Sequence, residues 1–295
     1  MSLKVSVIIP VYCKYNYLEE TLSSVYEQII NDSNGIEVCI IDDGSINYSR
    51  DDFFYLVSDI EKKYNKSNYE TKIYKNDANI GTVATLNKAI SKSDGDIIMT
   101  LASDDKIENK YVVEKLISFF IENSADVVTL KRKVYLENKY IYDVPSKFDI
   151  SILNKYKSNK LRQYICSGSN FISGSSTSFK RSVFYELNGF DEKYKLLEDL
   201  PFYEKVLSKG IKIHYFDYAS IKYNVGGVSS SSPHPEYIND INRFNDYLVK
   251  EKKLSFFYSR KFKYKTQIKK NRLLAMLLYP DVFINHIHNK IMWDR

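Results

Sequence analysis

Two adjacent carboxylates, Asp104 and Asp105, follow the apolar stretch at residues 96–101 and are well placed for chemistry. In an open α/β sheet, ligands bind beyond the carboxyl ends of the strands. One or two carboxylates there, together with substrate phosphates, can hold a hard divalent cation such as Mg²⁺ or Mn²⁺. Adjacent Asp residues also cap helices, here a helix expected over residues 109–122. The pair predicts either a metal and phosphate site or a helix cap.

A second pair, Asp42 and Asp43, directly follows the apolar run at residues 36–41 and precedes Gly44 and Ser45. A carboxylate at a strand end is a suitable acceptor for a hydrogen bond from a nucleotide base or ribose. The same residues suit a tight turn in which an Asp side chain bonds the backbone. Both interpretations stay open on the sequence alone.

A third acidic pair, Glu198 and Asp199, opens a helix expected over residues 200–209. The amino terminus of a helix favours an ionised carboxylate, which suits a general base, and the structural alternative is a plain helix cap. The segment 167–177 is rich in small hydroxyl side chains. It predicts either a turn or a loop that lines a polar acceptor.

Regular alternation of strands and helices through the first 125 residues must position these side chains. The β-branched run at residues 5–11 suits a buried parallel strand, and apolar residues recur at helical spacing over residues 18–29. Such alternation predicts a mostly parallel sheet with right-handed crossovers. The further elements expected are strands at 36–41, 71–75 and 96–101, and helices within 47–68, at 81–90 and at 109–122.

The rest of the chain is less regular. Residues 125–142 predict one or two strands, and the polar, Lys-rich segment 146–165 predicts a mobile insertion. The Gly- and Ser-rich run 225–233 predicts a flexible segment that closes the first domain. We therefore expect an α/β domain over residues 1–234, divided near residue 125, and a helical C-terminal extension over residues 235–295.

The basic character of the chain is local. The 295 residues carry a net charge of +6, yet residues 250–272 alone hold ten Lys or Arg against the single Glu251. Interleaved aromatics and the apolar run 273–279 give the profile of a helix lying on an anionic membrane. The alternative to membrane binding is a helical pair that packs on the catalytic domain, or on a second copy of the chain in a homodimer. The slightly acidic remainder argues against a nucleic-acid partner.

Composition excludes several other classes. The three cysteines, Cys13, Cys39 and Cys166, lack paired spacing, which indicates a reducing cytosol. No apolar run approaches the roughly 20 residues of a membrane span, so a soluble or peripheral protein is expected. Neither a dinucleotide-binding Gly-x-Gly-x-x-Gly nor a P-loop follows the first strand. His286 and His288 have metal-like spacing but no carboxylate nearby, which favours a packing role.

Taken in order, these motifs resemble the family 2 glycosyltransferases of the GT-A fold over about residues 3–230. Each motif is short, and the resemblance rests on their common order. The motifs are Val-Ile-Ile-Pro-Val-Tyr12, Ile-Asp-Asp-Gly-Ser45, Asn79-Ile-Gly81, Gly95-Asp96, Ser-Asp-Asp105, Gly189-Phe-Asp-Glu192 and Glu198-Asp199. The resemblance implies a nucleotide-sugar half over residues 1–125 and an acceptor half over residues 126–234.

The resemblance also implies roles for individual residues. Asp105 matches the metal ligand and Asp104 the carboxylate shared between ribose and metal, with Mn²⁺ or Mg²⁺ as cofactor. Asp199 matches the base that deprotonates the acceptor, so that one direct displacement inverts the anomeric configuration. The implied nucleotide contacts are Pro10, Val11 and Tyr12 around the base, Asp42 and Asp43 on base or ribose, and Asn79 and Gly81 near the diphosphate; the implied sugar or acceptor contacts are Gly174, Ser175, Ser176 and Glu198.

Three positions depart from the family pattern. Ala102 stands where many members place another Asp, and Leu86 stands where some place a phosphate-binding Arg. Many members have a late Tyr-Arg-Ile-His whose His joins the metal, and here the run ending at Gly226 reads Tyr-Asn-Val-Gly. An Ala like Ala102 is also found in a subset of such transferases, whereas Leu86 and Gly226 keep open the alternative of a catalytically impaired module that binds a nucleotide sugar.

The resemblance implies a metal-dependent hexosyl- or N-acetylhexosaminyltransferase. Its donor would be a UDP-sugar, and its acceptor a hydroxyl of a glycan or lipid-linked glycan in capsule, O-antigen or other surface polysaccharide. We expect such an enzyme in the cytoplasm, with peripheral contact at the inner face of the cell membrane.

Overall fold

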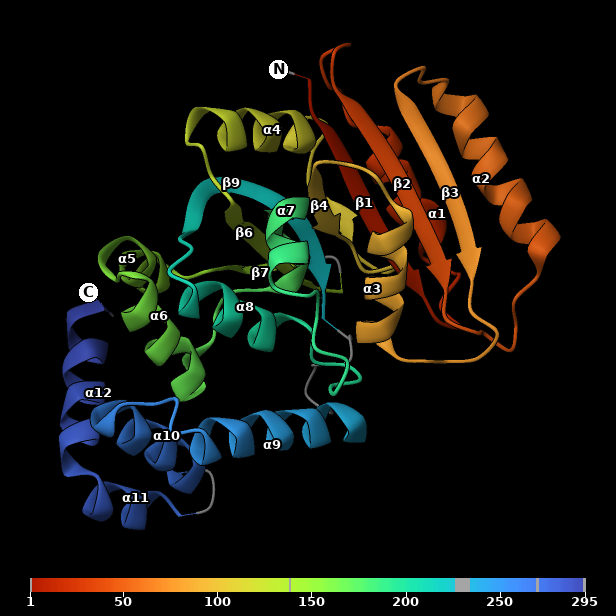
Figure 1. Ribbon diagram of the computed structural model, residues 1–295. Coiled ribbons are helices and arrows are strands. Elements are labelled where there is room, and N and C mark those ends of the chain that lie inside the picture. Colours follow the sequence, from red (N-terminus) through yellow and green to blue (C-terminus); the bar gives the residue numbers. More distant parts are fainter. Residues whose placement is uncertain (1, 138, 226–233, 269–270, 294–295) are drawn as a thin grey trace.

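A single mixed sheet with helices on both faces organises the computed structural model, which describes residues 2–137, 139–225, 234–268 and 271–293 (Figure 1). The strand order is β3-β2-β1-β4-β8-β6-β9-β5, with β7 paired to β6. The strands are β1 (Lys4–Val11), β2 (Gly35–Asp42), β3 (Tyr69–Lys75), β4 (Ile97–Thr100), β5 (Lys106–Ile107), β6 (Val127–Leu136), β7 (Lys139–Val144), β8 (Thr177–Lys180) and β9 (Ile213–Asn224).

The helices cover the sheet in two groups. One face is covered by α1 (Leu18–Tyr26), α2 (Arg50–Tyr64) and α4 (Val112–Glu122). The other is covered by α3 (Thr82–Lys92), α5 (Lys147–Lys155), α6 (Ser158–Tyr164), α7 (Arg181–Glu186), α8 (Asp199–Ser208) and α9 (Pro235–Lys250). Beyond these lie α10 (Phe256–Ile268), α11 (Arg272–Leu278) and α12 (Pro280–Trp293), at the lower left of Figure 1.

The first four strands form the parallel half that the alternation predicts. β1 pairs in parallel with β2 and β4, and β2 with β3. Because side chains alternate along a strand, Ile8 enters one core while Val7 and Ile9 enter the core on the opposite face. Apolar residues on both faces explain why β1 and β2 read as continuous hydrophobic runs.

The second half of the sheet is mixed. β8 runs antiparallel to both β4 and β6, and β9 runs parallel to β6 and antiparallel to β5. The α/β fold with a Rossmann-like parallel half and a C-terminal helical extension is therefore confirmed. The strand β9 had no counterpart in the sequence analysis, because its aromatic residues are interrupted by charged ones.

The segment 146–165 is helical, and the expectation of a mobile insertion was wrong in this respect. Ser146 and Asp149 form a reciprocal capping box that starts α5. Ile152, Leu153 and Leu161 are buried in the core that α3 and α8 share. The many lysines between these apolar residues hide the pattern, although the three apolar side chains anchor both helices.

The helix α9 belongs to the main core rather than to a detached extension. Phe244 and Leu248 are 2% and 1% exposed and lie in the same cluster as Tyr194. The Asp240 carboxylate accepts hydrogen bonds from the backbone N–H groups of Lys195 and Leu196, at 2.8 and 2.7 Å. The helices α10 to α12 have a small core of their own around Tyr264, Ala275 and Val282.

Two further expectations concern the end of the chain. Pro280 separates α11 from α12 and is the first residue of α12, where its missing N–H is harmless. Residues 226–233, most of the run expected to be flexible and including Gly226, lie outside the described residues, as do the side chains of His286 and His288.

Candidate functional site

Two chain segments that carry acidic residues lie on either side of β1 at the carboxyl edge of the parallel strands. Val11 of β1 pairs with Asp42 of β2, and the N–H of Asp43 donates to the Val11 carbonyl at 2.8 Å. On the other side of β1, the N–H of Leu101 donates to the Ile8 carbonyl at 2.9 Å, three residues before Asp104. The edge therefore carries both acidic pairs, with the 48% exposed side chain of Tyr12 beside them.

Asp43 organises the loop that follows β3. One carboxylate oxygen accepts the Asn76 side-chain amide and the Ile80 N–H, both at 2.9 Å, and the other accepts the Gly81 N–H at 3.0 Å. The turn and the loop touch closely at Gly44, where an added Cβ would lie 2.3 Å from the Ala78 carbonyl carbon. Asp43 thereby fixes the loop that presents the exposed Asn79.

Asp42 is completely buried and its oxygens are bonded within the protein. It accepts the Ser45 N–H at 2.9 Å and the Ser45 hydroxyl at 2.6 Å, and also the Tyr15 hydroxyl. Burial and the bond to Asp42 raise the pKa of Tyr15, so this phenol stays a donor. These contacts are the turn chemistry that the sequence offered as the alternative for Asp42.

Gly81 lies against the protein rather than facing an open space. Its φ is +91°, and an added Cβ would lie 2.4 Å from Lys195 Cγ and 2.8 Å from the Lys195 carbonyl oxygen. The N–H of Val83 donates to that carbonyl at 3.1 Å. The glycine therefore permits a close approach between the nucleotide-sugar half and the segment that leads into Glu198.

The turn that carries Asp104 and Asp105 is anchored to α1. The Thr21 hydroxyl lies 3.0 Å from the carbonyl of Ser103 and 2.9 Å from that of Asp105. Asp105 is 2% exposed, whereas Asp104 reaches the surface and forms a 3.0 Å ion pair with Lys14. The helix-cap alternative does not hold, because α4 begins at Val112 after the N-cap residue Tyr111, which makes no side-chain cap.

The third acidic pair approaches this edge through a short turn, Gly174–Ser176. The Thr100 hydroxyl at the end of β4 donates to the Gly174 carbonyl at 3.3 Å. A Cβ at Gly174 would lie 3.1 Å from Glu198 Oε1 and 3.5 Å from Asp199 Cβ. Gly174 thus joins the strand end that precedes Asp104 to the start of α8, and larger side chains at this position would collide with the acidic pair.

The two carboxyl groups of this pair have different electrostatic environments. Burial, and then the charge of Asp199, raises the pKa of Glu198 to about 8. Burial also raises the pKa of Asp199, but the N–H groups of Leu200 and Gly174 and the charge of Arg132 favour its ionised form. Burial opposes ionisation of both carboxyl groups, but at Asp199 the two N–H groups and Arg132 counteract this effect, which suits Asp199 better than Glu198 as a general base.

The sequence profile described as glycosyl transferase family 2 matches residues 6–187, more than half of the chain. The chain belongs to this family. The expected family is therefore confirmed, and the matched region contains the acidic pairs of the sheet edge and the Gly174 turn.

Two relatives of this family 2 glycosyltransferase are named for the synthesis of O-antigen and teichoic acid. It is 26% identical to the O-antigen chain rhamnosyltransferase RfbN of Salmonella typhimurium, over 75% of this chain and 67% of that protein. It is 28% identical to the minor teichoic acid biosynthesis protein GgaA of Bacillus subtilis, over 69% of this chain and 43% of that protein. The chain thus spans less than half of the second relative.

Solved structures of Staphylococcus aureus TarS share the fold. TarS 1-349 in complex with UDP-GlcNAc superposes with a TM-score of 0.61 at 22% identity, covering 83% of this chain and 66% of that one. TarS 1-349 without ligand in its title gives a TM-score of 0.60, covering 93% and 74%. Within the described residues of this family 2 glycosyltransferase, no helix is long and apolar enough to cross a membrane.

Several residues around Asp199 were missed by the sequence analysis. Arg132 of β6 stabilises the Asp199 charge, and its guanidinium carbon lies 4.2 Å from the centre of the Tyr223 ring. Tyr203 and Tyr237 lie near the acidic pair, and burial, followed by the charge of Asp199, raises the pKa of each phenol. No local motif marks these residues, because they come from β6, β9, α8 and α9.

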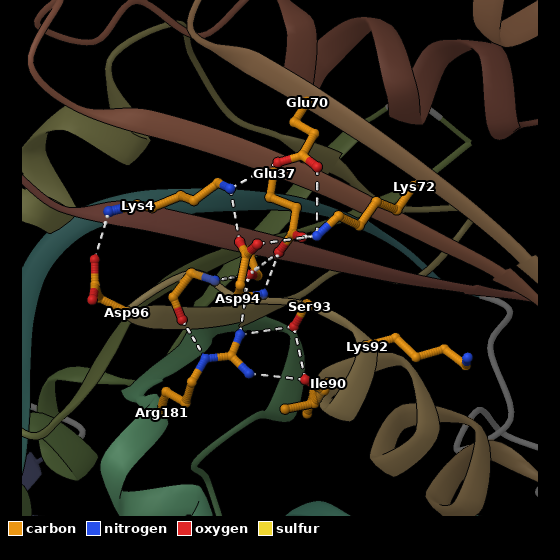
Figure 2. A network of polar contacts seen from close by, with 12 residues as sticks. Lys4, Glu37, Glu70, Lys72, Ile90, Lys92, Ser93, Asp94, Asp96 and Arg181 are labelled. Atoms are coloured by element: carbon orange, nitrogen blue, oxygen red, sulfur yellow. Dashed lines mark hydrogen bonds and ion pairs between the residues drawn. The ribbon is translucent and has the colours of Figure 1, made fainter.

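A different acidic cluster lies at the opposite, amino end of the strands (Figure 2). Ligand oxygens of Glu37, Glu70 and Asp94 lie within 4.8 Å of one another. Lys4 pairs with Glu70 and Asp94 at 2.8 and 2.7 Å, and Lys72 pairs with Glu37 and Asp94 at 2.6 and 3.1 Å. Two ammonium groups already occupy the space that a cation would need, so this cluster is a structural network.

Arg181 extends this network into the acceptor half. Its guanidinium donates to the carbonyls of Gly95 and Ile90 at 2.5 and 2.9 Å and to the Ser93 hydroxyl at 2.8 Å. Figure 2 shows Arg181 reaching from below toward Ser93 and Asp94. The cluster therefore fixes the two halves of the sheet to each other, far from the candidate catalytic edge.

Proposed function

We propose that this family 2 glycosyltransferase transfers a sugar from a UDP-sugar to a hydroxyl of a glycan acceptor, with inversion at the anomeric carbon. The observation that carries the proposal is the position of Glu198 and Asp199 against the Gly174 turn. That turn is bonded to the strand end preceding Asp104 and Asp105. This connection supports a base and a phosphate site at one edge of the sheet.

Different residues of the chain have different roles in the proposed reaction. Asp199 accepts the proton of the acceptor hydroxyl as it attacks, and the protonated Glu198 donates a hydrogen bond that orients the sugar or the acceptor. Tyr12, exposed at the end of β1, stacks on the uracil ring. Asp43 keeps the loop with Asn79 in place near the diphosphate, and Ser175 and Ser176 line the acceptor side.

The carboxylates at the strand end fit a hard divalent cation. Asp105 is buried next to the partly exposed Asp104, and both offer the oxygen ligands that Mg²⁺ and Mn²⁺ prefer. The bound metal would act as a Lewis acid that stabilises charge on the departing diphosphate. Lys14, paired with Asp104, adds a second positive charge at this position.

The relatives support a surface polysaccharide as the product. RfbN is named an O-antigen chain rhamnosyltransferase, and GgaA a teichoic acid biosynthesis protein. UDP-GlcNAc is bound in the fold neighbour TarS, which supports UDP as the nucleotide here. We propose a hexosyl or N-acetylhexosaminyl donor, and an acceptor glycan that carries a lipid.

Calorimetric titration of UDP, with and without Mn²⁺, tests the nucleotide site. Wild type and an Asp59→Ala control, which removes an exposed carboxylate of α2, should bind UDP more tightly with Mn²⁺. Asp105→Ala should lose the Mn²⁺-dependent part. Metal-independent binding in all three proteins would reject the proposed metal site.

Transfer assays with a panel of UDP-sugars then separate an enzyme from a binding module. Leu86 favours the module, because this side chain is 2% exposed within the core and offers nothing to phosphate. UDP binding without any transfer or donor hydrolysis would support the module. Turnover that disappears in Asp199→Asn would support the enzyme.

Helix α11 supports peripheral contact with an anionic membrane. Leu273 and Leu277 are 75% and 79% exposed, and they follow the basic helix α10. An apolar helix face next to lysines binds anionic lipid surfaces. Leu273→Ser with Leu277→Ser should weaken partition onto phosphatidylglycerol vesicles. Unchanged partition, or loss of a dimer in the variant, would favour a second copy of the chain instead.

A further inference from the structure

A hollow lies between α5 and α6 on one side and α10 and α12 on the other. The main cavity has a volume of about 670 Å³, and a smaller one of about 190 Å³ adjoins it. The main volume is typical of sites for small organic ligands. The residues that line both cavities are Phe148, Tyr164, Phe257, Lys261 and Asn285.

The walls of the hollow combine lysines with aromatic rings. Lys155, Lys160 and Lys261 line the main cavity, and none of the described lining residues of either cavity is Asp or Glu. The Lys261 ammonium lies 3.5 Å from the centre of the Tyr164 ring, and that of Lys160 lies 4.3 Å from the Tyr156 ring. The lining therefore presents positive charge on apolar, aromatic surfaces.

Lys261 differs from the other cations of α10. Arg260 forms two hydrogen bonds with Asp281, at 3.1 and 2.5 Å. Lys265 donates to the Gly168 carbonyl and to the Ser169 hydroxyl, both at 2.8 Å. Lys261 has no hydrogen-bond acceptor and no anionic partner among the described residues, apart from its contacts with aromatic rings.

The lack of a counter-charge makes the hollow receptive to an anion. Burial, together with the nearby charge of Lys265, lowers the pKa of Lys261 to about 7. A partly buried ammonium that has lost water is stabilised by an anion within hydrogen-bond distance. Among the described residues, the lining of the hollow therefore offers Lys261 no anionic group.

Tyr264 gives an independent indication of a ligand. It lines the smaller cavity and is 3% exposed, and its hydroxyl has no hydrogen-bond partner among the described residues. Buried hydroxyl groups are nearly always hydrogen-bonded in folded proteins. A polar group of a bound molecule would satisfy it.

We propose that this hollow binds a phosphate ester whose organic part has an apolar face. The phosphate pairs with Lys261 and Lys160, and the organic part packs against Tyr156 and Tyr164. Tyr264 hydrogen-bonds the end that enters the smaller cavity. The site is separate from the acidic pair at Asp199, so its existence does not depend on the transfer reaction. A sugar phosphate and a phospholipid headgroup both present this chemistry.

Titration of glucose 1-phosphate into the full chain tests the site, in excess UDP so that the proposed nucleotide site is filled. Wild type should bind, and Lys261→Met should bind about tenfold more weakly or worse, because a charge-assisted hydrogen bond is lost. Lys263→Met is the matched control, since Lys263 is exposed on the same helix and lines neither cavity. Lys261→Arg keeps the charge and should retain binding.

A second arm distinguishes the two sources of the phosphate. Sedimentation with phosphatidylglycerol vesicles, compared with phosphatidylcholine vesicles, reports on a lipid headgroup. Dependence on Lys261 in either arm, with Lys263→Met behaving as wild type, supports the site and identifies its source. The proposal is overturned if neither ligand shows this dependence, or if uncharged glucose binds as tightly as its phosphate. Thermal melting confirms that each variant is folded.

Discussion

The two ends of the parallel strands both gather carboxylates, yet they have opposite electrostatic surroundings. At the amino end, Lys4 and Lys72 neutralise Glu37, Glu70 and Asp94. At the carboxyl end, backbone N–H groups and hydroxyls hold the acids, and the nearest cation of Asp104 is an exposed lysine. Ion pairs with two lysines thus hold the acidic cluster at the amino end, whereas hydrogen bonds hold Asp42 and Asp43 at the carboxyl end.

Removal of one carboxylate at each end of the strands should give the largest difference in transfer activity. Asp199→Asn should reduce transfer by about 10²–10⁴-fold, because the amide cannot accept the acceptor proton, while UDP affinity is kept. Asp94→Asn, at the amino end, should leave kcat unchanged. Comparable losses of kcat in both variants would show that Asp199 acts through the fold and not as a base.

Removal of a lysine at the amino end should mainly affect stability. Lys72→Met leaves the buried carboxylate of Glu37 without its ion-pair partner and should cost about 3 kcal/mol in the free energy of unfolding. The control Lys4→Met should cost less than about 1 kcal/mol, because its partners Glu70 and Asp94 are largely exposed. Urea unfolding measures both, and equal costs would contradict this view of the network.

The two ends should also respond to pH in opposite directions. The pKa of Glu198 rises from 4.5 to about 8, so its stabilising contribution is complete below 4.5 and disappears as the pH rises through about 8. The pKa values of Glu70 and Asp94 are lowered by Lys4, so their contribution is present at neutral pH and disappears in acid.

Glu198→Gln should isolate the first of these effects. Between pH 5 and 8 the free energy of unfolding of wild type should fall by ~1–3 kcal/mol relative to the variant, after allowance for partial exposure. Melting curves at several pH values give this difference. A constant difference across the range would mean that Glu198 is ionised throughout.

The smallest effect is expected from the exposed lysine at the carboxyl end. Lys14→Met should change the free energy of unfolding by less than about 1 kcal/mol, because the Lys14–Asp104 pair lies in solvent. The same urea series that includes Lys72→Met measures it. If Lys14→Met lowered the free energy of unfolding as much as Lys72→Met, the proposed difference between the two ends of the strands would be wrong.

Local sequence patterns were sufficient for the parallel half of the fold. The β-branched runs that became β1 and β2, and the helical spacing from Leu18 to Val25, carry their own signal over a few residues. Ile29 belongs to the same spacing but is 41% exposed, because α1 ends at Tyr26. The segments α5, α6 and β9 were missed. Their apolar residues are sparse among lysines and are buried only by contacts with elements that are distant in the sequence.

By itself, the sequence determined the family, the order of the elements and the strand ends at which Asp42, Asp43, Asp104 and Asp105 stand, because these depend on neighbouring residues. The tertiary structure alone decided which groups surround each acid. Arg132 and Gly174 reach Asp199 from other elements, and Lys72 reaches Glu37 from the neighbouring strand. Burial and electrostatic pairing are properties of residues brought together across the fold, so no local pattern contains them.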